Sequence, residues 1–62
     1  MKLYKETNGV RKALGETTDN PAWLIDFICL NASMHGWGCE HIGDAVKITY
    51  HDGIVSTYSV EP

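Results

Sequence analysis

The sequence places three potential metal ligands close together: His35, Cys39 and His41. Zinc binds imidazole nitrogen and thiolate sulfur in a tetrahedron, so these side chains could hold it with one further ligand. Candidates for that further ligand are Cys29, Glu40 and His51. The spacing His-x3-Cys-x-His matches no standard zinc site, and the sequence has no Cys-x2-Cys pair. A zinc-stabilised domain that uses His35, Cys39 and His41 is therefore one functional hypothesis, the alternative to the protein-binding module described below.

The other cysteine, Cys29, has an ordinary interpretation as a buried thiol. It lies in the middle of an expected helix, about one and a half turns before His35, and is not expected to share an ion with it. The sequence shows no secretory signal, and cysteines in proteins without one are more often free than disulfide-bonded. We therefore expect two free thiols in a cytoplasmic protein, with no bound cofactor.

Cys39 and His41 could also act as a nucleophile and its base, because residues two apart in a strand point to the same face. No carboxylate that would orient His41 and no oxyanion hole can be assigned from the sequence. Asp44 and Asp52 fit turns better than they fit general acids. A glycine-rich phosphate loop, a hydrolase elbow and an EF-hand pattern are all missing from the sequence. The sequence predicts that the protein is not an enzyme.

The chain is organised around an apolar segment with helix signals at both ends. Asp19 or Asn20 can accept backbone N–H groups as the N-cap, and Pro21 suits the first helical position. Gly36 can adopt the left-handed conformation that ends a helix. These signals predict one main helix over about residues 20–35.

This helix has few polar positions. At about 100° per residue, Asp26 and Ser33 are the only polar residues that lie on the same side of the helix. This predicts that the helix has a narrow solvent-exposed face and is covered by other parts of the protein on most sides. The rest of the chain can cover one side of the helix. Ile25 and Leu30 are then left for another surface, which a homodimer or a partner protein would supply.

Two segments at the C-terminal end alternate apolar and polar residues and predict an antiparallel hairpin, over about 45–50 and 54–60. A three-residue loop ending at Gly53 would set Val46 opposite Tyr58 and gather the apolar side chains on one face. Without a third strand, the segment 54–60 would be an exposed edge at which another chain could add a strand. Val55 and Thr57 are the residues we expect to contact such a chain.

The first part of the chain allows two interpretations. Asn8-Gly9 is a strong signal for a hairpin turn, with strands on both sides. Alternatively, a short strand at 3–5 precedes a short helix at about 9–14, an interpretation favoured by poor alternation in the second segment. The glycine-rich segment 36–44 predicts an irregular loop in which Trp37 folds back onto the helix end, or else is presented to a partner.

Length and charge limit the functions available. A chain of 62 residues forms one domain, here 1–62, and its net charge of −3 disfavours binding to nucleic acid. The apolar segment is too short to span a membrane. The sequence therefore predicts a single acidic α+β domain, with the main helix packed on the C-terminal hairpin and an N-terminal strand available as a third.

The first functional hypothesis is a small non-enzymatic module that binds another protein or a second copy of itself. By analogy with other small acidic chains, it would be an accessory protein of a phage or mobile element that inhibits a host protein by docking. The expected interaction residues are Ile25, Leu30, Trp37, Val55 and Thr57.

Overall fold

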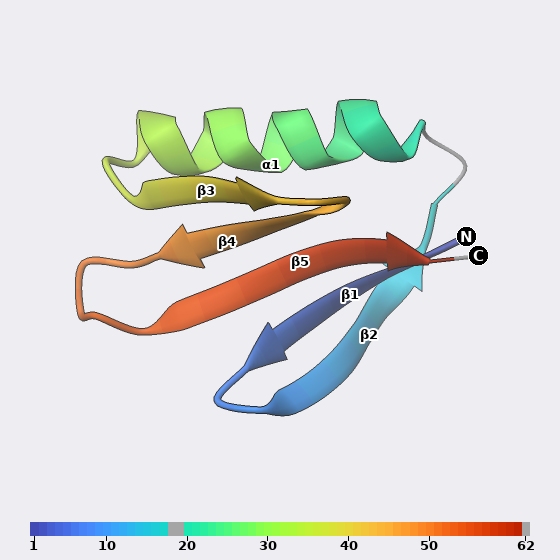
Figure 1. Cartoon of the computed structure of the whole chain (residues 1–62), viewed down its shortest axis with the longest axis horizontal. Coiled ribbons are helices and arrows are strands. Elements are labelled where there is room, and N and C mark those ends of the chain that lie inside the picture. The colour runs from blue at the N-terminus through green and yellow to red at the C-terminus, as the bar shows by residue number, and fades with distance from the viewer. Residues whose placement is uncertain (18–19, 62) are drawn as a thin grey trace.

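The computed structural model describes residues 1–17 and 20–61, and shows a small α+β fold. Its elements are β1 (Lys2–Thr7), β2 (Val10–Glu16), α1 (Pro21–Met34), β3 (Gly38–Ile42), β4 (Ala45–Thr49) and β5 (Val55–Glu61). The five strands form one antiparallel sheet in the order β2-β1-β5-β4-β3, and α1 packs on one of its faces. Figure 1 shows α1 alongside β3 and β4. The helix makes no contact with β1 or β2. Among the described residues, no helix is both long enough and apolar enough to cross a bilayer.

The main helix begins and ends as its local signals predict. The side chain of Asn20 accepts hydrogen bonds from the backbone N–H groups of Ala22 and Trp23, at 2.9 and 3.3 Å, which confirms Asn20 as the N-cap. Asp19, the alternative cap, lies outside the described residues. Gly36 has φ +76°, the left-handed conformation expected after the last turn.

The N-terminal segment is a hairpin, so the prediction of a short helix at 9–14 is wrong. Asn8 and Gly9 have φ of +54° and +79° and form a two-residue turn between the paired residues Thr7 and Val10. Positive φ at both positions is the geometry that brings two twisted strands together. Pairing along β1 then outweighs the modest helix propensity of the second segment.

The segment predicted as an irregular loop contains β3. Gly38 begins this strand opposite Thr49, and a Cβ at Gly38 would meet the Thr49 side chain at 3.4 Å. Gly43, with φ +57°, lies in a two-residue turn to β4. Gly43 therefore permits the tight turn, and neither glycine disrupts the strand.

The register predicted for the C-terminal hairpin is confirmed. Val46 lies opposite Tyr58, and the N–H of Tyr50 donates to the carbonyl of Ile54 at 2.9 Å. The N-terminal strand that the sequence offers as a third strand is β1, which pairs with β5 on its other side, so the segment 54–60 is not an exposed edge. The edge strands are β2 and β3, so Val55 and Thr57 lie within the sheet.

The core between α1 and the sheet is small. Among the described residues its buried apolar side chains are Ile25, Ala32, Val46 and Ile48. Ser56 is buried beside them, and its hydroxyl is 2.7 Å from that of Thr7, so the buried oxygen has a hydrogen-bond partner. So small a core makes each of its side chains important to stability.

Two tyrosines that are hydrogen-bonded to each other pack against this core. The hydroxyls of Tyr50 and Tyr58 are 2.7 Å apart, and the ring of Trp37 meets Tyr50 edge-on at 4.7 Å. Burial, followed by the hydrogen bond to Tyr50, raises the pKa of Tyr58 well above its ordinary value near 10. The folded chain therefore holds the Tyr58 proton at a pH where the unfolded chain releases it.

This difference predicts a loss of stability in alkali. Below about pH 10 the contribution of Tyr58 is complete, and it falls as the pH rises further, because only the unfolded chain gains by ionising. Urea unfolding between pH 8 and pH 11 should show this fall in the wild type. Tyr58→Phe should be less stable at pH 8, since it lacks the hydrogen bond, but should lose less stability on going to pH 11. If the wild type and Tyr58→Phe lose equal stability between pH 8 and pH 11, Tyr58 is not the source of the fall.

Candidate functional site

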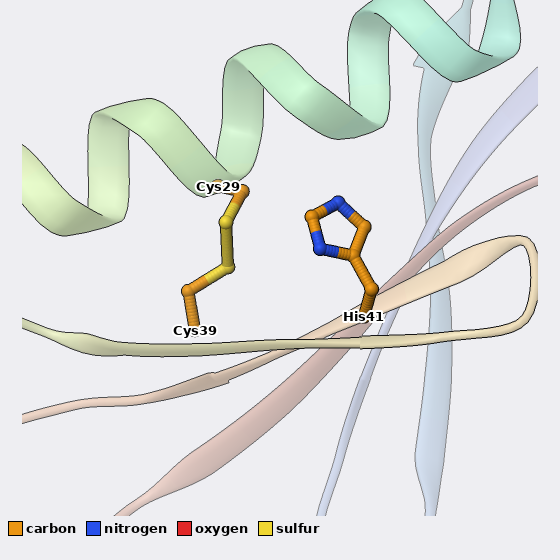
Figure 2. Close-up of side chains that lie close together, drawn as sticks. All are labelled: Cys29, Cys39 and His41. Atoms are coloured by element: carbon orange, nitrogen blue, oxygen red, sulfur yellow. A yellow bond between two sulfur atoms is a disulfide. The ribbon is translucent and has the colours of Figure 1, made fainter.

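The structure brings Cys29, Cys39 and His41 together beneath α1 (Figure 2). The ligand atoms of all three lie within 4.8 Å of one another. Cys29 is one turn of α1 after the buried Ile25, on the side of the helix that faces β3. Cys39 and His41 are two apart in β3 and therefore point to the same face of the sheet, toward the helix.

The two sulfur atoms form a disulfide, so the prediction of free thiols is wrong. The Cα atoms of Cys29 and Cys39 are 5.7 Å apart, an ordinary separation for a disulfide. The bond ties the middle of α1 to the edge strand β3. The expectation of an irregular loop gave Cys39 no defined position relative to the helix. In β3, Cys39 lies opposite Ile48, whose side chain is in the core under α1.

A carboxylate does face His41, contrary to the sequence-based expectation. Nε2 of His41 lies 3.2 Å from Oδ1 of Asp26, which is one turn before Cys29 on α1. Both side chains are half or more exposed, and they border an open hollow between the start of α1 and the β3–β4 turn. Two spacings in the sequence could have indicated this group. Asp26 and Cys29 are one helical turn apart, and Cys39 and His41 are two apart, as residues on one face of a strand are.

The other two histidines lie elsewhere. Nδ1 of His35 donates to the carbonyl oxygen of Asn31 at 2.8 Å, and the ring stacks on Trp37 at 4.5 Å. Nε2 of His51 donates to the carbonyl oxygen of His35 at 3.1 Å. The proposed ligand set of His35, Cys39 and His41 is therefore not assembled, because His35 caps the helix end and turns toward Trp37.

The expected interaction residues do not share one surface. Ile25 is buried in the core, whereas Leu30 is 59% exposed on the opposite side of α1. Trp37 is half-buried against its aromatic neighbours. Val55 and Thr57 are half-buried on the face of the sheet that α1 does not cover. The residues that do accompany Leu30 are Trp23, Phe27 and Met34, which are also large, apolar and exposed.

The Cys29–Cys39–His41 cluster has two chemical states. In the oxidised state it is a covalent link between α1 and β3, and Cys39 is not available as a nucleophile. In the reduced state it would present two thiols and an imidazole, which are ligands that soft divalent metals prefer. Comparison of the chain with protein-family profiles, with curated proteins and with solved structures gives no match.

Proposed function

We propose that this chain is a small non-enzymatic protein-interaction module that pairs with a second copy of itself through the outward face of α1. The observation that carries the proposal is a row of large apolar side chains on this face, the outward stripe. Its members and exposed fractions are Trp23 56%, Phe27 48%, Leu30 59% and Met34 79%. Groups of this kind on a monomer surface mark interaction sites.

The spacing of the outward stripe matches a helix-pairing seam. Its residues follow one another at steps of four, three and four, which is the a/d repeat of a coiled coil. A helix that only covers a sheet needs one apolar stripe, and α1 already has one in Ile25 and Ala32. The second stripe, on the opposite side, therefore serves a second contact.

The same spacing argues for a second copy as the partner. The steps of four, three and four residues are the same in both directions along the helix. In two antiparallel copies of α1, every member of the outward stripe would therefore face a member of the other stripe. Phe27 would face Leu30 of the second copy, and Trp23 would face Met34 of the second copy, where sulfur packs well on an aromatic ring. Antiparallel helices also place opposite ends of their dipoles together.

Charge permits this pairing although each chain carries a net charge of −3. The only charged side chain on α1 is Asp26, which lies to one side of the outward stripe. In the antiparallel arrangement its neighbour across the seam is Ser33 of the second copy, not Asp26. No like charges therefore meet at the contact.

The two aromatic rings at one end of the outward stripe are already packed against each other in the single chain. Trp23 and Phe27 stack with centroids 5.4 Å apart and planes 19° from parallel. Aromatic side chains that are ordered before association lose little conformational entropy on binding. Large aromatic residues are also the commonest source of binding energy at protein interfaces.

The expected contact is small. An apolar side chain of this size covers ~150–250 Å² when fully buried, so two copies of the half-exposed stripe would bury roughly 800–1000 Å² in total. This is at the low end for specific interfaces. We therefore expect a dissociation constant of roughly 10–100 μM.

Sedimentation equilibrium of the oxidised chain tests the proposal. The wild type should change from monomer to dimer over that concentration range. Leu30→Asp and Met34→Asp should each raise the dissociation constant at least about 30-fold, because the acid would be buried against an apolar neighbour. Met34 is the more exposed of the two, so its variant should fold normally.

Val10→Asp is the matched control. Val10 is 70% exposed on β2, which α1 does not contact, and the substitution adds the same charge to the chain. It should change the dissociation constant by no more than about twofold. A wild type that stays monomeric at millimolar concentration would overturn the proposal, and so would a dimer that Leu30→Asp leaves intact.

A further inference from the structure

We propose that reduction of the Cys29–Cys39 disulfide converts this cluster into a zinc site, with Sγ of Cys29, Sγ of Cys39 and Nδ1 of His41 as ligands. The proposal differs from the one drawn from the sequence, which used His35 in place of Cys29. It is also independent of the pairing of two copies, because none of the three ligands belongs to the outward stripe.

The positions of the three residues suit one ion. Donor atoms around a tetrahedral zinc lie roughly 3.5–3.8 Å from one another. The three ligand atoms are already within 4.8 Å of one another, and breaking the S–S bond lets the sulfurs separate toward that spacing. Both cysteines and the histidine are on regular elements, α1 and β3, which keep the three side chains close.

The contact of His41 with Asp26 fixes which nitrogen is free. Nε2 lies 3.2 Å from the carboxylate of Asp26, which accepts a hydrogen bond from it, so in the neutral imidazole the lone pair is on Nδ1. Figure 2 shows the imidazole beside the disulfide, with one ring nitrogen directed toward the sulfur atoms. A carboxylate behind a histidine ligand is the usual second layer of a zinc site, where it orients the ring and makes the nitrogen a better donor. Asp26 is therefore a positioning residue.

Solvent can reach the cluster from one side. His41 is about half exposed and borders the open hollow at the start of α1, whereas both cysteines are half-buried. An ion can therefore enter past His41, and a water molecule can fill the fourth position. The described residues show no second cluster of this kind.

The conversion needs an external dithiol as reductant. Two electrons and two protons pass from the dithiol to the Cys29–Cys39 bond, which breaks to give two thiols while the dithiol becomes a disulfide. Zinc then binds both sulfurs as thiolates, and the two thiol protons are released to solvent. The metal does not change its oxidation state. It replaces the covalent link between α1 and β3 by a coordinate one.

Titration of the reduced chain with zinc alone, in competition with a chromophoric chelator, tests the proposal. The reduced wild type should bind one zinc ion per chain, and the oxidised wild type should bind none. Cobalt in place of zinc should show the absorption of a tetrahedral site and thiolate-to-metal charge transfer. If the reduced chain is unfolded without metal, zinc should restore its far-UV circular dichroism.

Variants separate the roles of the ligands. His41→Ala keeps both thiols and should weaken zinc binding at least about 100-fold, whereas Asp26→Asn should weaken it about 10- to 100-fold without changing the stoichiometry. His51→Ala is the matched control and should bind zinc as the wild type does, and so should Leu30→Asp. The proposal is wrong if the reduced wild type binds no stoichiometric zinc, or if His41→Ala binds it equally well.

Discussion

Replacing Cys29 and Cys39 together by serine should lower the free energy of unfolding by about 2–3 kcal/mol. The disulfide closes a loop with a sequence separation of 10 residues and so restricts the unfolded chain. A domain of this length has a total stability of roughly 3–9 kcal/mol, so the loss is a large part of the whole. The corresponding fall in melting temperature is on the order of 10–20 °C.

Urea unfolding in the presence of a metal chelator measures this effect. The matched control is the wild type under reducing conditions, which lacks the same link without any substitution and should unfold near the same urea concentration as the double variant. The oxidised wild type should unfold at a clearly higher concentration. Identical midpoints for the oxidised wild type and the double variant would show that the link contributes nothing.

Ile48→Ala should cost about 2–5 kcal/mol, the usual range for removing a buried aliphatic side chain. Ile48 is 1% exposed and packs in the core cluster with Ile25 and Ala32. It lies between Cys39 of β3 and Ser56 of β5 in the sheet, so neighbouring strands cannot easily close the space. The variant should therefore unfold at a much lower urea concentration than the wild type.

Ile54→Ala is the matched control, because it removes the same atoms from a side chain that is 44% exposed in the β4–β5 connection. It should cost less than about 1 kcal/mol. Circular dichroism of both variants during urea unfolding makes the comparison. Equal losses would mean that the buried cluster is not the main source of stability.

The two predictions concern two sources of stability, a small apolar core and one covalent link. Small domains commonly combine the two, because their surface is large relative to their volume. In this chain the link is also the part that a reductant can remove and, under our proposal, the part that zinc can replace. Stability would then depend on redox conditions and on metal.

Features set by neighbouring residues could be predicted from the sequence. Asn20 and Gly36 mark the ends of the helix through hydrogen bonds to residues two and three positions away and through the local backbone angle. The register of the C-terminal hairpin followed from the alternation of its strands and from Gly53, which has φ +86°. Such interactions are encoded within a few positions, so one sequence is enough to identify them.

The candidate site could be predicted only in part. The spacing of Cys39 and His41 identifies these two residues as a pair. It does not connect them with Cys29 and Asp26, because the glycines of the intervening segment predict an irregular loop. The strand β3 owes its existence to pairing with β4, which no local pattern around Gly38 and Gly43 requires. Contacts between α1 and β3 could therefore not be inferred before both elements were placed.

The sequence by itself determined where the helix and the last two strands lie, and that the helix is apolar around most of its circumference. Only the tertiary structure decided which side of that helix is covered. Apolar residues occupy opposite faces of α1, so their periodicity could not distinguish Ile25, which is buried, from Leu30, which is exposed. The choice depends on how side chains from distant strands pack against one face, and that packing exists only once the sheet has formed.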